Sequence, residues 1–148
     1  MVADGATGTR KDAAGEKIAM TAPVVTVDDA PSAAGAQNYT MQFIMPSKYT
    51  SVESLPRPTD ERVQLVQLPQ RVLAVRQFGG RATEEGVARQ AAALREAMAR
   101  DSVRATAAAA AAPPQLARYN DPFTPGCLRT NEVWYVVDQA SLPEAAKQ

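Results

Sequence analysis

The sequence has no histidine and a single cysteine, Cys127. Without histidine the chain lacks Ser-His-Asp and Cys-His nucleophile pairs, the usual general base, and the commonest protein ligand of zinc and haem iron. One cysteine excludes a disulfide bond within the chain and is compatible with a reducing compartment. The sequence also has no spaced metal ligands, no glycine-rich phosphate cradle and no convincing pair of catalytic carboxylates. We therefore expect that the protein is not an enzyme and holds no metal site of its own.

An excess of charge of either sign is also lacking. Sixteen Lys and Arg residues balance 16 Asp and Glu residues, and the isoelectric point is about 6.3. Proteins that bind nucleic acid normally carry a basic excess or a basic stripe, and the chain shows neither. The longest apolar-looking run, residues 105–112, is alanine apart from Thr106 and is too short to span a bilayer. We expect neither a nucleic-acid partner nor a membrane span.

Residues 1–15 contain no apolar segment, so we do not expect a secretory signal. They lack the apolar side chains that would offset the entropy cost of ordering, which predicts a disordered tail or the remnant of a transit peptide. This composition suits a cytoplasmic or a plastid protein equally. A folded domain is expected over residues 16–140, and a C-terminal tail over residues 141–148.

Two strands are expected in the first third of the chain. Residues 18–27 are β-branched or apolar but contain Pro23, which predicts an edge strand or a bulge, because proline cannot donate to a strand ladder. Residues 39–46 alternate between apolar and polar side chains, as a half-buried antiparallel strand does. We expect its apolar face to lie in the core: Tyr39, Met41, Phe43 and Met45. Residues 47–62 contain two prolines and predict a connection with at most one helical turn.

One helix is expected, over residues 83–100. Thr83 is a suitable N-cap, and Glu84 and Glu85 in the first turn favour the helix dipole. Four apolar residues at helical spacing predict a stripe that faces a sheet: Val87, Ala91, Leu94 and Met98.

The remaining segments predict more strands, at residues 62–68, 71–78, 115–120 and 131–138. The alanine tract after Arg104 predicts a long loop with a short strand at 102–106. In the last strand, Trp134 should anchor the core, and Glu132 would pair with an arginine of a neighbouring strand. Mostly antiparallel strands with one main helix correspond to the α+β class, with about six strands in the sheet.

Three segments together resemble the SOUL haem-binding family. They are "KIAMTAPV" (17–24), "VLAVRQFGG" followed by "TEE" and a helix (72–100), and "ARYNDPFTPGCLRTNEVWYVV" (117–137). The resemblance implies a duplicated unit of strand, helix and three further strands that closes into a distorted barrel. The implied function is reversible, non-covalent binding of haem or another tetrapyrrole in an apolar groove, without catalysis.

The chain departs from the family pattern at its start. In the family, a strand and a helix precede the "MTAPV" strand, and the helix forms much of the groove wall. Here only about fifteen polar, alanine- and glycine-rich residues precede this strand. We therefore expect an N-terminally shortened member in which a sheet edge and an apolar face are exposed.

The resemblance suggests six contacts to the tetrapyrrole: Lys17, Ile18, Met20, Thr21, Leu128 and Arg129. Met20 would supply a soft groove wall, the alternative being a core position in its strand. Arg129 and Lys17 would pair with carboxylates of the ligand, and so would the arginines between Arg57 and Arg81 unless they lie on a solvated face. Iron would be held by apolar contact or by Cys, Met or Tyr; Cys127 is either such a ligand or an ordinary loop thiol.

Two functions remain open at this stage. The first is a tetrapyrrole carrier or buffer, with another apolar small molecule as a possible ligand. The second is a protein-interaction module, or a degenerate copy of the domain, that binds no haem and forms a homodimer or needs a partner.

Overall fold

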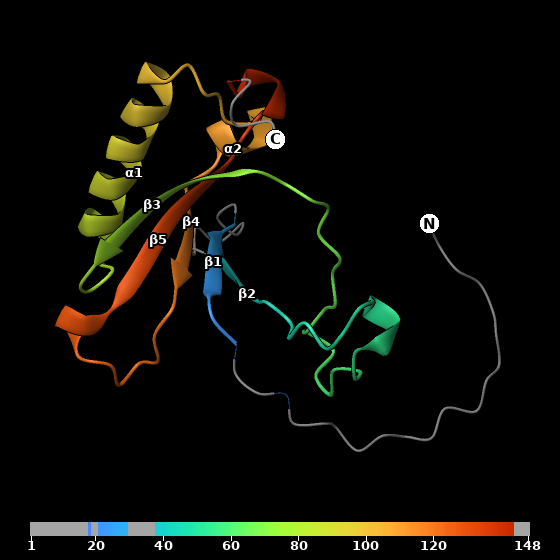
Figure 1. The fold of residues 1–148 in the computed structure, drawn as a ribbon. Coiled ribbons are helices and arrows are strands. Elements are labelled where there is room, and N and C mark those ends of the chain that lie inside the picture. Colours follow the sequence, from blue (N-terminus) through green and yellow to red (C-terminus); the bar gives the residue numbers. More distant parts are fainter. Residues whose placement is uncertain (1–17, 19–20, 30–37, 144–148) are drawn as a thin grey trace. The chain divides into compact units, whose positions relative to one another are not determined.

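The computed structural model describes residue 18, residues 21–29 and residues 38–143 (Figure 1). The chain divides into two compact units, one formed by Met1–Met20 and Met45–Leu68, the other by Thr21–Ile44 and Pro69–Gln148. In the first unit, the described residues contain one short 3-10 helix, η1 (Val52–Ser54). This single turn confirms the expected connection over residues 47–62.

The second unit is a five-stranded antiparallel sheet with one main helix, which confirms the α+β class. The strands follow one another across the sheet in the order β2-β1-β4-β5-β3. Their bounds are β1 (Val24–Asp28), β2 (Tyr39–Phe43), β3 (Leu73–Gly79), β4 (Gln115–Arg118) and β5 (Thr130–Val136). Two edges, β2 and β3, are therefore left at the ends of an open sheet.

Helix α1 (Glu84–Arg100) lies along β3 and β5 (Figure 1). Thr83 caps it as expected, because the Thr83 hydroxyl accepts a hydrogen bond from the Gly86 backbone N–H at 3.1 Å. The predicted apolar stripe is confirmed, since it packs on a cluster of buried sheet residues: Leu116, Val133, Tyr135 and Val137. Each fully buried side chain of this size contributes about 1.5–3 kcal/mol to folding.

The two sides of the sheet differ in what covers them. On one side, which we call the helix side, Val133 and Leu116 pack against α1. On the opposite side, which we call the far side, Val25, Ala117 and Trp134 form a separate buried cluster. Directly opposed residues of an antiparallel pair point to the same side, so the strand register assigns every residue of the sheet to one side.

β1 begins directly after Pro23 and lies between β2 and β4. The prediction of an edge strand or a bulge at Pro23 is therefore wrong. The proline precedes the first residue of the strand, where its missing N–H removes no bond from the ladder. The Ala22–Pro23 peptide bond is cis.

Residues 62–68 do not form a strand, and the sheet has five strands rather than about six. The segment belongs to the first unit, where Val63, Val66 and Leu68 are exposed. Alternation alone does not make a strand, because the backbone groups also need a neighbouring strand to bond with.

The alanine tract forms a short helix, α2 (Ala107–Ala111), instead of the expected loop. Alanine has the highest helix propensity, and the Thr106 hydroxyl accepts a bond from the Ala109 N–H at 3.3 Å. The expected strand at 102–106 is reduced to a single bridge between Ala105 and Val137. Because Gln115 opposes Trp134, residues 106–114 stand opposite only residues 135–136 of the neighbouring strand. Ala105 and Gln115–Arg118 thus form one strand that is interrupted by the inserted residues 106–114, which contain α2.

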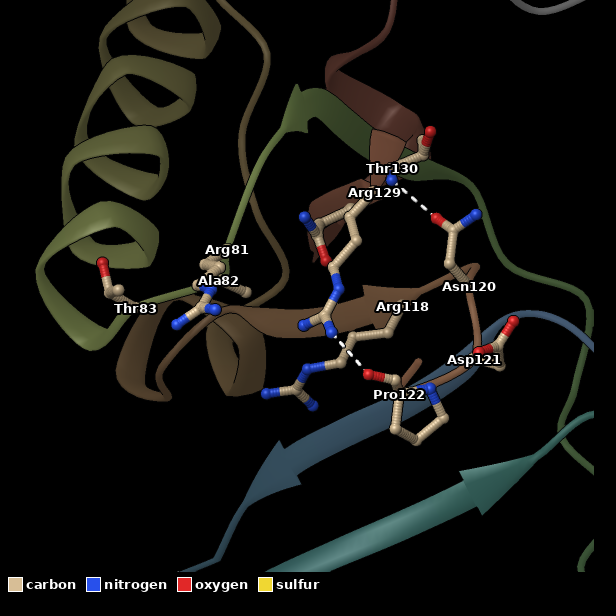
Figure 2. A pocket seen from close by; sticks show the side chains of 10 residues that line it. Arg81, Ala82, Thr83, Arg118, Asn120, Asp121, Pro122, Arg129 and Thr130 are labelled. Carbon is tan, nitrogen blue, oxygen red and sulfur yellow. Dashed lines mark hydrogen bonds between the residues drawn. The ribbon is translucent and has the colours of Figure 1, made fainter. Parts of the chain in front are cut away.

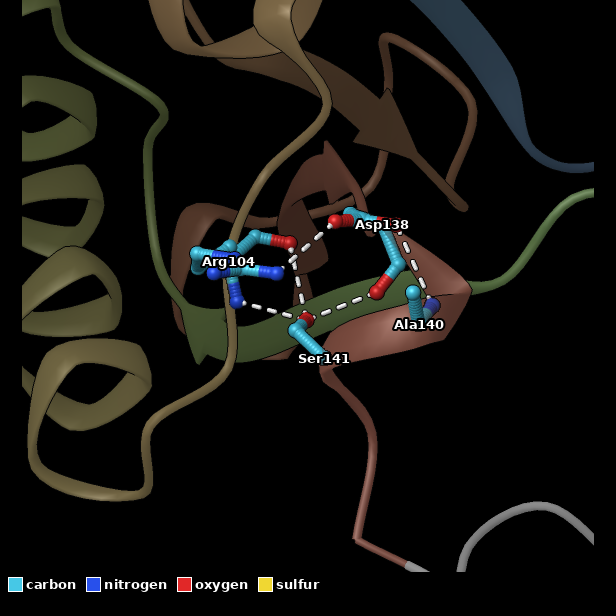
Figure 3. A network of polar contacts seen from close by, with 4 residues as sticks. All are labelled: Arg104, Asp138, Ala140 and Ser141. Carbon is cyan, nitrogen blue, oxygen red and sulfur yellow. Dashed lines mark hydrogen bonds and ion pairs between the residues drawn. The ribbon is translucent and has the colours of Figure 1, made fainter.

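The chain beyond β5 is tied to the start of this interrupted strand (Figure 3). The Ser141 hydroxyl accepts a bond from the Arg104 N–H at 2.8 Å and donates to the Asp138 carbonyl at 2.6 Å. The Arg104 guanidinium and the Asp138 carboxylate form an ion pair at 3.3 Å. Ordered structure therefore continues through the 3-10 helix η3 (Gln139–Ser141), and Leu142 packs against the main core.

Candidate functional site

The predicted core face of β2 is exposed, which corrects the sequence-based expectation. Tyr39 and Met41 are 59% exposed and Phe43 is 52% exposed; Met45 lies outside β2 and is half-buried. The alternating residues do form a strand, but α1 packs over β3 and β5 at the other end of the sheet, so it does not cover them. These three exposed side chains, with Val24 and Thr26 of β1 beside them, form a surface that we call the β1–β2 face.

The β1–β2 face lies on the helix side of the sheet. Phe43 opposes Val24, Val24 opposes Arg118, and Arg118 opposes Asn131 in one row across four strands. Because neighbouring strands are about 4.8 Å apart, Phe43 and Arg118 are separated by about 10 Å along this row. An apolar surface and a cationic side chain are therefore neighbours on the same side of the sheet.

A cavity of about 540 Å³ lies at the end of this row, close to the first turn of α1 (Figure 2). Three arginines line it, and we call it the arginine pocket: Arg81 precedes α1, Arg118 ends β4 and Arg129 precedes β5. Figure 2 shows the guanidinium groups of Arg118 and Arg129 near each other, with Arg81 in the same opening. Cavities that bind small molecules usually measure about 300–1,000 Å³, so this one has a suitable size.

The loop between β4 and β5 is held in shape by Arg129. Its Nε donates to the Thr124 carbonyl at 2.8 Å, and its Nη2 donates to the Pro122 carbonyl at 2.6 Å. Asn120 also closes the loop, because its Oδ1 accepts a bond from the Thr130 N–H at 2.6 Å.

Asp121 is the acidic residue among those that line the arginine pocket. Its carboxylate accepts bonds from the Phe123 N–H at 2.8 Å and from the Thr124 N–H and hydroxyl. The bond from the Phe123 N–H, followed by that from the Thr124 hydroxyl, lowers the pKa of Asp121 below its usual value. Figure 2 shows this carboxylate directed away from the arginines. Its hydrogen bonds stabilise the turn that it begins and do not pair it with an arginine.

Arg118 and Arg81 reach the pocket from different elements. The Arg118 Nη1 donates to the Thr26 hydroxyl at 2.7 Å. The Arg81 side chain passes Gly126, where an added Cβ would lie 3.4 Å from the Arg81 Cγ. The buried Asn131 donates from Nδ2 to the Gly80 carbonyl at 2.9 Å, which ties β5 to the turn that carries Arg81.

A smaller cavity of about 210 Å³ lies between α2 and the far side of the sheet, where Val27 and Trp134 line it. Next to it, the Glu132 carboxylate accepts bonds from the Trp134 Nε1 at 2.8 Å and from the Tyr119 hydroxyl at 2.7 Å. Burial, and then the bond to Glu132, raise the pKa of Tyr119 to about 12. The expected pairing of Glu132 with an arginine is wrong, because the Trp134 indole and the Tyr119 hydroxyl bond its carboxylate instead.

The predicted ligand contacts near residue 128 are close to the arginine pocket. Cys127 and Leu128 belong to the 3-10 helix η2 (Gly126–Leu128), and both are exposed. Arg129 follows them and lines the pocket. Their roles as ligand contacts stay predictions.

The predicted contacts near residue 18 are distributed differently. Lys17 and Met20 lie outside the described residues. Ile18 is half-buried in the first unit, whereas Thr21 belongs to the second unit and donates from its hydroxyl to the Ile44 carbonyl.

Sequence reasoning missed Arg118 and named Arg81 only as the last of the arginines between Arg57 and Arg81 that could pair with ligand carboxylates. Both lie within the family-like segments 72–100 and 117–137, but the resemblance assigns them no role. They meet only because the end of β4 and the turn before α1 border the same cavity. A usable signal existed for Arg118: it occupies the helix-side position of its strand and falls just before the turn residues Asn120 and Asp121.

The described residues lack the features of two other kinds of site. Within the described ranges, no three His, Cys, Asp or Glu side chains are grouped so that they could hold a metal ion. None of the helices in the described part of the chain has the length and apolar character that crossing a bilayer requires.

A family model described as SOUL heme-binding protein matches residues 7–136, which is most of the chain. The chain belongs to the SOUL family. Comparison with curated proteins found no significant match. The α+β fold, with its antiparallel sheet and main helix, agrees with the SOUL assignment, although the five strands form an open sheet instead of a closed barrel.

Proposed function

We propose that the protein binds haem or a related tetrapyrrole, reversibly and without a covalent bond, on the β1–β2 face. The observation that carries this proposal is the exposed row of Tyr39, Met41 and Phe43 on a strand with no charged side chain. A flat surface of aromatic and thioether groups suits a planar, apolar macrocycle. Membership in the SOUL family supports the same class of ligand.

The polar groups of such a ligand also have a counterpart. The row from Phe43 to Arg118 joins the apolar face to a cationic side chain at a separation of about 10 Å. A tetrapyrrole carries an apolar ring and carboxylates at its edge, so the two kinds of surface match the two parts of the ligand.

The open surface implies modest affinity. Burying ~300 Å² of apolar surface contributes ~8 kcal/mol at ~25 cal/mol per Å². The full ~8 kcal/mol would correspond to a Kd of about 1 μM, and loss of translational and rotational freedom offsets part of it, so we expect a Kd that is micromolar at best. Such affinity suits a carrier or buffer that releases its ligand.

Iron would be ligated weakly or not at all by this chain. Histidine is absent, which leaves Cys, Met and Tyr as protein ligands, and Tyr39 and Met41 lie on the proposed face. We expect spectra of high-spin or weakly ligated iron. A low-spin spectrum with two nitrogen ligands would contradict the proposal.

Titration with hemin tests the proposal, with the Soret band as readout. The triple variant Tyr39→Ser, Met41→Ser and Phe43→Ser should lose the saturable shift that the unchanged protein shows. The matched control is the double variant Val63→Ser and Val66→Ser, because these residues are 55% and 68% exposed but lie in the first unit. Equal affinity of the triple variant and the control would contradict binding on the β1–β2 face.

A second function, self-association, is favoured by the edge strand β2. Its five residues, "YTMQF", carry no charge, and one side of its backbone has no strand partner in the sheet. Such an edge can pair with the same strand of a second copy in antiparallel fashion. Sedimentation over a range of concentrations should then show a dimer, and Gln42→Lys should return it to a monomer. Gln42 points to the far side, so this change spares the proposed ligand face.

A further inference from the structure

Among the described residues, the three cations of the arginine pocket have no anionic partner. Elsewhere in the described chain, Arg62, Arg100 and Arg104 each form an ion pair with an aspartate. Arg81, Arg118 and Arg129 form none within the described ranges, although the chain as a whole has equal numbers of acidic and basic residues. Like charges that share a cavity repel each other, and a bound anion removes that cost.

Most hydrogen-bond donors of these arginines are still available. A guanidinium has five N–H donors. Arg129 uses its Nε and Nη2 to bond loop carbonyls, and Arg118 uses Nη1 to bond Thr26. The Arg81 guanidinium donates to no group in the described part of the chain, although the Arg81 backbone carbonyl accepts a bond from the Thr83 N–H. The remaining donors can form the paired, charge-assisted bonds that carboxylate and phosphate groups accept.

The pocket is also held in shape before any ligand arrives. The two bonds of Arg129 fix its guanidinium against the loop, and the Arg81 stem lies along Gly126. Donors that are already fixed lose less conformational entropy on binding.

The first turn of α1 contributes to the field in the pocket. Thr83 lines the cavity and caps the helix, whose N-terminal end carries a partial positive charge. Glu84 and Glu85 reduce this contribution, but neither lines the cavity. The arginines therefore carry the argument, and the helix adds to it.

We infer that the arginine pocket is a binding site for an oxyanion, either a phosphate or a pair of carboxylates. This site is distinct from the apolar β1–β2 face and does not require that a macrocycle be bound there. The anion has two sources that share this chemistry: a small free oxyanion, or the carboxylates of a tetrapyrrole that lies on the neighbouring face.

Calorimetric titration with pyrophosphate at low ionic strength tests the first source. We expect one saturable site, weakened about tenfold or more in Arg81→Gln and in Arg118→Gln, because each change removes charge-assisted bonds. Arg57→Gln is the control, since it removes the same charge from an exposed position in the first unit. Added salt should also weaken binding. Arg129→Gln would not separate ligand binding from loop structure, because Arg129 also bonds two carbonyls of the β4–β5 loop.

Titrations with hemin and with its dimethyl ester, which has no free carboxylates, test the second source. If the carboxylates occupy the pocket, hemin binds more tightly than the ester, and Arg81→Gln and Arg118→Gln remove the difference. Binding of pyrophosphate without competition by hemin supports the site with a free anion as its ligand.

Two results would overturn the inference. One is the absence of pyrophosphate binding together with equal affinity for hemin and its ester. The other is binding of either ligand that the two arginine variants and the Arg57→Gln control affect equally. If the proposed function is wrong, the result is different: the dimethyl ester does not bind, whereas pyrophosphate still does.

Discussion

Over β3 and β5 the helix side of the sheet is covered by α1, whereas over β1 and β2 the same side presents exposed apolar residues. Strands of both parts carry apolar side chains on this side of the sheet, so apolar character alone does not explain the difference. The covered part has a helix with a matching apolar stripe, and it forms the main core. The comparison shows that one side of a single sheet can provide both a core and a binding surface.

The sharpest test of this comparison uses two methionines. Met98 of α1 is 8% exposed and Met41 of β2 is 59% exposed. Met98→Ala should lower the free energy of unfolding by about 2–5 kcal/mol, because it leaves a cavity in the core. Met41→Ala should change it by less than about 0.5 kcal/mol. Urea unfolding measures both, and similar losses would mean that the β1–β2 face is covered in solution.

Two asparagines, one in the loop after β4 and one in β5, give the next largest effect. Asn131, in the part of the sheet that α1 covers, is 3% exposed and donates to the Gly80 carbonyl. Asn120, in contrast, is exposed. Asn131→Ala should cost about 1–3 kcal/mol, because it leaves the half-buried Gly80 carbonyl without its donor. Asn120→Ala should cost less, since water can replace its bond. If Asn120→Ala is the more damaging change, the loop contributes more to stability than its exposure suggests.

The two helix caps give a smaller contrast. Thr83→Ala should cost about 1 kcal/mol, because α1 is long and its packing depends on its first turn. Thr106→Ala should cost less, since α2 has five residues and none of them is buried. Thermal unfolding of both variants measures the difference. Equal losses would show that α2 contributes to the core as α1 does.

The far side of the sheet provides the smallest expected effect, as a dependence on pH. The phenol of Tyr119 has a pKa of about 12 in the folded protein and about 10 in an unfolded chain. The unfolded chain therefore loses this proton first, and the stabilisation, fully present below pH ~10, is lost as pH rises toward ~12. The free energy of unfolding of Tyr119→Phe should lack this pH dependence. The difference in unfolding free energy between the unchanged protein and the variant should therefore shrink between pH ~10 and ~12. Tyr119 is 36% exposed, so water weakens the effect. A constant difference would mean that neither burial nor the bond to Glu132 raises the pKa of Tyr119 in solution.

Much of the fold could be predicted because the signals are local. The stripe of α1, its Thr83 cap and the last strand around Trp134 each follow from a few consecutive residues. The departure from the family pattern led us to expect an exposed apolar face, but its location at Tyr39 and Phe43 could not be predicted, because it depends on which strands α1 covers.

The candidate site was less predictable than the fold. The family resemblance drew attention to Arg129, but the arginine pocket also needs Arg81, from the turn before α1, and Arg118, from the end of β4, to which the resemblance assigned no role. Residues 62–68 illustrate the opposite error, since their pattern resembles a strand but they find no neighbour in the sheet. In both cases contacts between distant segments decided the outcome.

The insertion that contains α2 has a consequence for how the chain tolerates change. The strand leaves β5 at Ala105 and rejoins it at Gln115, and both attachment points are held by their own pairings. The length between them can therefore vary without shifting the register on either side, since closing a longer loop adds little entropy cost. A reporter peptide grafted between Ala107 and Ala111 should leave the sheet, the β1–β2 face and the arginine pocket in place.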